Sequence, residues 1–160
     1  VGAEQVVALD IVPGKLDLAR QLGATDTVDA GAQDALEQVK DLTGGGVDFA
    51  FEMAGSVPAL ELAYKITRRG GTTVTGGLAH PSKTLSIQQV SLVGEEHTLK
   101  GSYIGSCVPS RDIPRYIGLF RRGRLPVDRL MSERVGFDEL NAAFDRLASG
   151  ETVRQVLIPA

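Results

Sequence analysis

Short apolar runs rich in β-branched residues alternate with helical stripes along the sequence, and glycine stands at many of the boundaries. Residues 6–10, 25–29, 47–52, 72–75, 98–103 and 156–158 are predicted strands. Helical stripes follow Pro13, Ala35, Ser56, Ser110 and Phe137, with a less regular stretch at 80–94 that includes a possible strand near Leu85 and a helical turn near Val90. Glycines at 23, 44–46, 70–71, 123 and 150 are expected to end these helices. The pattern predicts an α/β fold with a doubly wound parallel sheet.

In such a sheet, ligands bind outside the carboxyl ends of the strands. The residues expected there are Asp10-Ile11, Met53-Ala54-Gly55, Gly76-Gly77-Leu78 and Ser102-Tyr103-Ile104-Gly105. Three of these turns contain glycine and are mostly uncharged, as a flat ring lying against backbone requires. Glycines after strands also serve simply as turn formers, so the pattern leaves both interpretations open.

Asp10 ends an otherwise apolar strand. A carboxylate at this position can accept two hydrogen bonds from a ribose diol, and it would repel the 2′-phosphate of NADP. The next residue is Ile11, and no arginine stands there to accommodate that phosphate. The alternative is an ordinary aspartate that caps the following helix.

Two cations are further candidates for a cofactor site. Lys15 lies one helical turn into the first helix and can reach the same ribose, although a lone helix lysine is usually a solvated surface residue. Arg154 precedes the last strand, and its planar guanidinium can clamp a phosphate. An ion pair with Glu151 or another acid is the alternative for Arg154.

Other kinds of site have little support. The soft metal ligands are His80, His97 and Cys107, and none stands at a zinc-ligand spacing, so we expect no metal site and no activated nucleophile. A formal net charge of −3 at pH 7 argues against binding to a nucleic-acid backbone. A single cysteine excludes an internal disulfide and favours a reducing cytoplasm. No apolar run approaches the ~20 residues that span a bilayer.

The glycine-rich phosphate loop of dinucleotide-binding folds, G-x-G-x-x-G, is absent. It would precede Asp10 by roughly 20 residues, and the chain starts too late to contain it. The first residue is Val1 rather than methionine. We therefore expect a piece of a longer protein, with the first strand missing and a gap in the sheet beside residues 6–10.

Several ordered segments resemble the zinc-type medium-chain alcohol dehydrogenases. These segments are residues 6–11 with Lys15, Leu16 and Ala19; residues 22–25; residues 44–52 with Gly55; residues 101–106; and residues 149–154. They correspond to the family's second strand and helix, its fourth-strand signature, its last strand and its C-terminal segment. Each motif is weak alone, but the ordered series spans nearly all of the chain.

The resemblance implies a Rossmann-like domain that binds NAD. Asp10 would hold the adenosine ribose diol with help from Lys15, and Ile11 would lie beside the adenine. The other implied contacts are Met53 and Ala54 in the cofactor groove, Gly76, Gly77 and Leu78 beside the nicotinamide, Tyr103 and Ile104 at the carboxamide, and Arg154 at the pyrophosphate.

The family's chemistry is hydride transfer between an alcohol or aldehyde and the nicotinamide, with zinc polarising the oxygen. Its zinc ligands, two cysteines and a histidine, lie upstream, so zinc is expected only in the full-length enzyme. We assign no catalytic residue and expect the isolated chain to be inactive. Residues 1–160 would form an incomplete dinucleotide-binding domain plus the C-terminal segment. Residues 83–101 would pair subunits into a homodimer or tetramer.

Four alternatives stay open. One is a dehydrogenase of the same family that acts on a thiol adduct of formaldehyde. A second is a zinc-free quinone or enoyl reductase that uses NADPH, against which Asp10 followed by Ile11 argues. A third is a Rossmann-like methyltransferase core, against which the regular strand–helix order and Arg154 argue. The fourth is a purely structural module that dimerises through its sheet edge.

Overall fold

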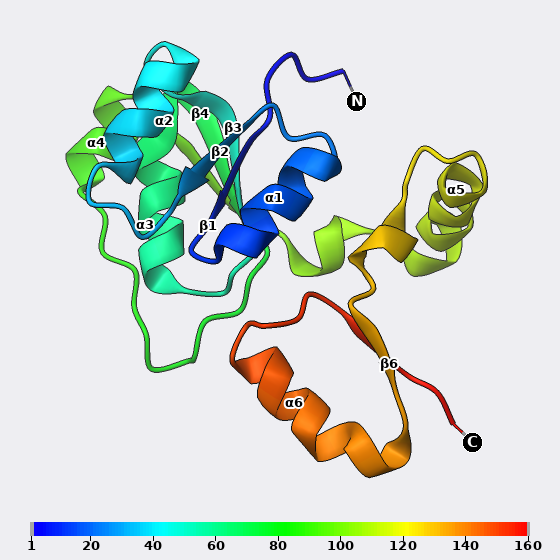
Figure 1. The fold of residues 1–160 in the computed structure, drawn as a ribbon. Helices are drawn as coiled ribbons and strands as arrows, with labels where there is room; N and C mark the ends of the chain where they lie inside the picture. Colours follow the sequence, from blue (N-terminus) through cyan, green and yellow to red (C-terminus); the bar gives the residue numbers. More distant parts are fainter. Residues whose placement is uncertain (1, 160) are drawn as a thin grey trace. The chain divides into compact units, whose positions relative to one another are not determined.

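The computed structural model describes residues 2–159 (Figure 1). The chain divides into two compact units. The first unit comprises the residues up to Ile11 together with Gly23–Cys107. The second comprises Val12–Leu22 together with the residues from Val108 onward. Among the described residues, no helix is long and apolar enough to cross a membrane.

The strands of the first unit are all parallel to their partners. Strand β1 (Val7–Asp10) pairs with β2 (Asp26–Asp29), and β4 (Thr67–Thr75) lies between β3 (Val47–Glu52) and β5 (Thr98–Gly101). Within residues 2–159, β1 and β3 share no backbone pairing, so these strands form two separate sheets. The expected α/β fold with parallel sheets is confirmed.

Two helices join these sheets through a common core. Helices α2 (Ala35–Thr43) and α3 (Val57–Ile66) lie side by side against the strands (Figure 1). The buried core residues are Val28, Ala35, Val39, Ala50, Ala63 and Ile66, with Val7 and Leu9 packed against them. Val39 is fully buried, and burial of one such side chain stabilises the fold by about 1.5–3 kcal/mol. The core therefore draws on both sheets although their backbones are not paired.

The helix ends follow the expected local chemistry in most places. Ser56 caps α3, because its hydroxyl accepts a hydrogen bond of 3.3 Å from the Ala59 amide. Gly44 ends α2 in the left-handed region, with φ of 66°. The helical turn expected near Val90 is α4 (Gln89–Gly94), whereas residues near Leu85 form no strand in the described structure.

The expectation that Gly70-Gly71 ends a helix was wrong. Helix α3 ends at Ile66, and β4 begins at once with Thr67 instead of at residue 72. The pairing of β3 with β4 shifts register between Val47 and Phe49. A Cβ on Gly71 would lie 2.6 Å from Thr67 Cγ2 and 2.8 Å from the Arg68 carbonyl oxygen. The glycine pair therefore permits this tight irregularity inside a strand.

The second unit contains two elements that the sequence did not predict. Strand β6 (Glu133–Val135) pairs in parallel with β7 (Gln155–Leu157), and η2 (Val127–Leu130) precedes it. The Glu133 carboxylate accepts hydrogen bonds from Arg146 Nε on α6 (Leu140–Ala148) and Gln155 Nε2, at 2.9 and 2.6 Å. The Arg146 guanidinium, followed by the Gln155 amide, holds the pKa of Glu133 below its usual range.

Helix α1 (Pro13–Gln21) belongs to the second unit. Its C-terminal carbonyl, at Gln21, accepts a 3.2 Å hydrogen bond from Arg129 Nη1. Pro13 starts the helix and Gly23, with φ of 109°, follows its end, as the sequence indicates. Turn η3 (Phe137–Glu139) leads into α6, so the helical stripe expected after Phe137 is confirmed.

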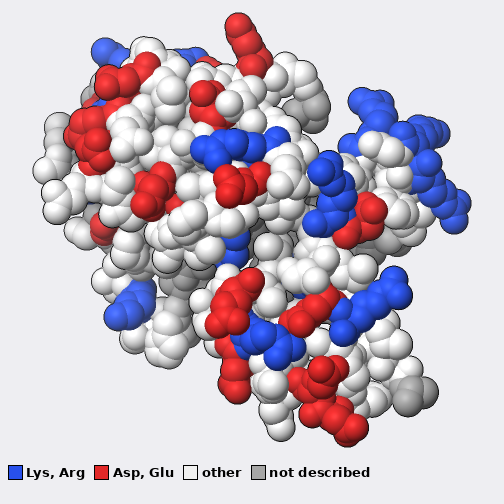
Figure 2. All heavy atoms as spheres, in the orientation of Figure 1, with Lys and Arg blue, Asp and Glu red and all other residues white. Residues whose placement is uncertain are grey.

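Helix α5 (Pro109–Arg121) corrects a second expectation, because Ser110 does not cap it. The N-cap residue is Val108, whose amide donates a 2.8 Å hydrogen bond to the buried carboxylate of Asp112 in the first turn of the helix. Arg111 and Arg115 bind the same carboxylate. Figure 2 shows basic side chains gathered over α5, at the right of the view. Arg111 and Arg115 therefore form ion pairs with Asp112 in the first turn of α5.

Candidate functional site

The turns after β3, β4 and β5 meet at one edge of the three-stranded sheet. The amides of Gly76 and Gly77 donate to the Glu52 carbonyl oxygen, at 2.9 and 3.3 Å. The Ser102 amide donates to the Thr75 carbonyl oxygen at 2.9 Å. Each strand end thus holds the first residues of the neighbouring turn. The structure brings together the expected segments around Met53, Gly76 and Tyr103.

Backbone packs directly against backbone where the first two turns meet. A Cβ on Gly77 would lie 2.2 Å from the Gly55 nitrogen and 2.5 Å from its Cα. A Cβ on Gly55 would in turn lie 2.9 Å from the Leu78 carbonyl oxygen, and Gly55 has φ of 69°. Since neither position tolerates a side chain, the two turns pack against each other through their peptide groups.

Glu52 is a buried acidic residue beneath these turns. Its Oε1 accepts a 2.6 Å hydrogen bond from the Gly55 amide, and its Oε2 accepts a 2.7 Å bond from the Thr75 hydroxyl. The side chain is nearly inaccessible to water. Glu52 was not among the site residues predicted from the sequence, although it ends a strand shortly before a glycine turn, in a position similar to that of Asp10.

Apolar side chains surround this edge and remain exposed. Leu78 is 81% exposed and Tyr103 is 74% exposed, and Met53 and Ile104 also face solvent. Tyr103 and Ile104 lie in the η1 turn (Tyr103–Ser106) rather than at the end of β5, which stops at Gly101. Ile104 has φ of 49°, a conformation that is costly for a β-branched residue. Strain of this kind often marks a functional turn.

Asp10 is the last residue of β1, as expected, and it is half-buried. Asp10 lies in register with Asp29 at the end of β2, and the Ala30 amide donates to the Asp10 carbonyl oxygen at 3.1 Å. Asp29 accepts a 2.8 Å hydrogen bond from the Gly31 amide. Ile11, the next residue, is 71% exposed. Two carboxylates therefore stand at neighbouring strand ends, and only Asp10 was predicted as a site residue from the sequence.

The two cationic candidates, Lys15 and Arg154, both lie in the second unit. Lys15 Nζ lies 3.7 Å from the position that a Cβ on Gly150 would occupy, so its side chain reaches the turn after α6. Arg154 lines a cavity of about 300 Å³ between α6 and β7, together with apolar side chains such as Phe144 and Leu147. The structure thus places both cations close to the segment between α6 and β7.

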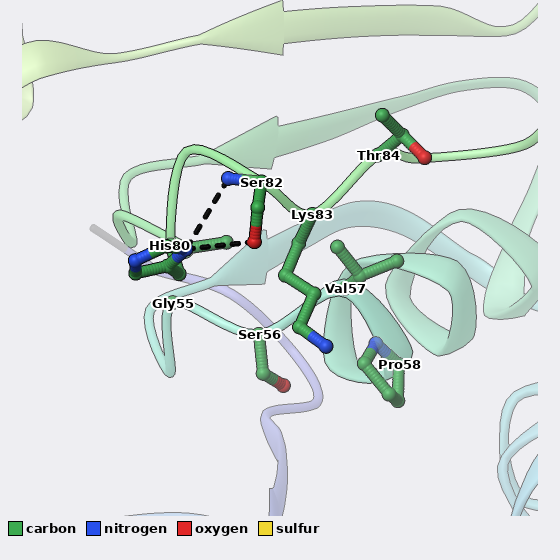
Figure 3. Close-up of a pocket in the computed structure, with 9 residues that line it drawn as sticks. Gly55, Ser56, Val57, Pro58, His80, Ser82, Lys83 and Thr84 are labelled. Carbon is green, nitrogen blue, oxygen red and sulfur yellow. Dashed lines mark hydrogen bonds between the residues drawn. The ribbon is translucent and has the colours of Figure 1, made fainter.

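A larger cavity, of about 560 Å³, adjoins the glycine turns (Figure 3). It lies between the start of α3 and the loop at residues 79–84. Figure 3 shows the Lys83 side chain extending toward Ser56 and Pro58 at the start of α3. His80 Nδ1 forms a 2.8 Å hydrogen bond with the Ser82 hydroxyl and accepts a 3.2 Å hydrogen bond from the Ser82 amide. Among residues 2–159, no three His, Cys, Asp or Glu side chains are grouped to hold a metal ion.

Comparison with known proteins identifies extended similarity. The family model described as zinc-binding dehydrogenase matches residues 1–122. Alcohol dehydrogenase-like 5 of Arabidopsis thaliana is 32% identical over 160 residues, which cover 98% of this chain and 41% of the relative. The chain therefore spans less than half the length of that relative.

Two solved structures extend the likeness to the backbone. Benzyl alcohol dehydrogenase from Acinetobacter calcoaceticus superposes with a TM-score of 0.93 at 32% identity, over 99% of this chain and 44% of that one. A putative zinc-binding dehydrogenase from Sinorhizobium meliloti, solved bound to NADP, superposes with a TM-score of 0.87 at 28% identity, over 99% of this chain and 46% of that one.

Proposed function

Because this chain belongs to the zinc-binding dehydrogenase family, we propose that it is the cofactor-binding part of an oxidoreductase that transfers hydride between an alcohol and NAD. The observation that carries the proposal is the carboxyl edge of β3, β4 and β5. Closely packed peptide groups and exposed apolar side chains form the surface there. A nicotinamide ring requires such a surface, and ligands of open parallel sheets bind at this edge.

The proposed contacts combine this geometry with the contacts that the family resemblance implies. Gly76, Gly77 and Leu78 flank the nicotinamide, while the backbone of Tyr103 and Ile104 meets its carboxamide. Met53 and Ala54 line the groove beside them, and their turn is held against the glycine pair. Of the two cations, Arg154 would meet the pyrophosphate and Lys15 would assist at the ribose. Residues 1–160 would form an incomplete dinucleotide-binding domain with a C-terminal segment.

We propose NAD rather than NADP, on the basis of the residues at the end of β1. Asp10 would accept hydrogen bonds from the ribose diol, and Ile11 would lie beside the adenine. The negative charge of Asp10, reinforced by Asp29 in register with it, would repel a 2′-phosphate. One similar structure was solved with NADP, so this preference rests on the carboxylates of this chain and requires a direct test.

The family description names zinc, whose role in such chemistry is to polarise the substrate oxygen. The described residues bring no suitable set of ligands together. We therefore propose that zinc and the catalytic residues belong to other parts of a longer protein. We also propose that the isolated chain is inactive. Residues 83–101 are the proposed site of pairing with further copies, and the cytoplasm is the proposed location.

The cofactor proposal predicts a result for Asp10→Asn in the full-length enzyme. Asparagine keeps the size of the side chain but removes its charge, so affinity for NAD should fall about tenfold, or ~1.4 kcal/mol. The preference over NADP should shrink as well. Calorimetric titrations with NAD and NADP measure both effects, with Asp41→Asn, an exposed change on α2, as the matched control.

Three outcomes of these titrations would contradict the proposal. Tighter binding of NADP than of NAD by the unaltered enzyme would favour a reductase that uses NADPH. Binding of S-adenosylmethionine without binding of NAD would favour a methyltransferase. An unchanged NAD affinity in Asp10→Asn would remove the assigned role of the carboxylate.

A further inference from the structure

We propose that Glu52 is a positioning residue, which holds the turn after β3 and the turn after β4 in one fixed arrangement beside the proposed nicotinamide site. The inference rests on the proposed function and assigns no contact between Glu52 and the cofactor. The carboxylate acts through Gly55, on the turn after β3, and through Thr75, the last residue of β4 before Gly76 and Gly77.

The hydrogen bonds of Glu52 divide between the two turns. One carboxylate oxygen accepts from the Gly55 amide at 2.6 Å, and the other accepts from the Thr75 hydroxyl at 2.7 Å. The carbonyl oxygen of the same residue accepts from the amides of Gly76 and Gly77. A single residue therefore binds four groups in two segments that are 20 or more positions apart in the sequence.

Burial of the Glu52 side chain makes its hydrogen bonds necessary for stability. Glu52 is only 4% exposed, and a buried carboxylate is tolerated when hydrogen bonds replace its lost hydration. Both hydrogen bonds to the side chain are short, at 2.6 and 2.7 Å. Without the carboxylate, the Gly55 amide and the Thr75 hydroxyl would lose this partner. The turns would then be held by the backbone bonds alone.

A shift of either turn would reach the proposed ring surface. Gly55 and Gly77 are in direct backbone contact, and Gly55 also packs against the backbone of Leu78. A movement at Gly55 is therefore transmitted to Gly77 and Leu78 without any intervening side chain. Displacement of a bound reactant by about 1 Å can lower a catalytic rate on the order of 100-fold.

The test compares Glu52→Ala, Glu52→Gln and Thr75→Val in the full-length enzyme. Glutamine keeps an oxygen for the Gly55 amide and places an N–H near Thr75 Oγ1, which can accept, so it should retain most of the arrangement. Valine at position 75 removes one donor with little change in volume and keeps the test available if Glu52→Ala fails to fold. Glu37→Ala, an exposed change on α2, is the matched control.

Two measurements are made on each variant. Hydrogen exchange of residues 53–57 and 76–80 reports on the turns without any cofactor. We expect Glu52→Ala to exchange about tenfold faster there, with residues 35–43 of α2 unchanged. Steady-state kinetics with NAD should show kcat falling 10- to 100-fold for Glu52→Ala, a smaller loss for Thr75→Val, and rescue in Glu52→Gln.

The outcomes separate the inference from the function on which it rests. Unchanged exchange in Glu52→Ala overturns the role of Glu52, whatever the enzyme binds. Faster exchange with unchanged kcat and cofactor affinity shows a merely structural bond and overturns the positioning role. An unaltered enzyme without affinity for NAD overturns the proposed function itself, and the exchange data would then report only on the turns.

Discussion

At the scale of single residues, the backbone contact between Gly77 and Gly55 leaves no room for a side chain at position 77. Gly77→Ala would place a Cβ 2.2 Å from a backbone nitrogen, so the turns must move apart, at a cost of about 1–3 kcal/mol of unfolding free energy. Gly76→Ala is the control, because its Cβ would first meet Met53 Sδ, at 3.0 Å, on a flexible side chain. Urea denaturation of both variants measures the difference, and equal midpoints would show that the contact is not rigid.

At the scale of elements, the start of α5 depends on an ionised Asp112. Hydrogen bonds from Arg111 and then from the Val108 amide hold the pKa of Asp112 below its usual range. A lowered native pKa means that stabilisation is complete above the ordinary aspartate pKa and is lost as the pH falls toward the native value. Asp112→Asn should therefore remove this part of the acid dependence and lower stability near neutral pH.

Urea midpoints between pH 2 and pH 7 test the Asp112 prediction. The difference in midpoint between the unaltered chain and Asp112→Asn should be largest near neutral pH and narrow as the carboxylate becomes protonated. Asp138→Asn, an exposed change in η3, is the control. A difference that stays constant with pH would mean that packing, and not charge, makes the contribution of Asp112.

At the scale of the whole molecule, the division into separate sheets should appear in amide exchange. Strand β4 has partners on both sides, whereas β1 pairs only with β2 among the described residues. About half of the amides of a strand with one partner lack a bond in the ladder. In the 160-residue chain, we expect amides of β4 to exchange at least tenfold more slowly than the most labile amides of β1. Equal protection of β1 and β4 would contradict the observed pairing.

Local patterns determined most of the elements and the fold class. The alternation over residues 47–52 predicted β3 with the observed bounds, and Ser56 and Gly44 marked helix ends, because capping and periodicity depend on near neighbours in the sequence. The same local evidence placed Asp10 at the end of a strand. It also indicated which turns carry the glycines that the structure brings to one edge.

Tertiary structure alone decided the features that depend on distant residues. Thr67 begins β4 instead of continuing α3, because its partner is Val47, and Gly71 is required by the approach of Asp48 and Thr67. The role of Glu52 depends on Thr75, 23 positions away, and on Gly55. Strand register and backbone contact join segments that no periodicity relates, so the sequence specified the pieces of this site but not the carboxylate that holds them together.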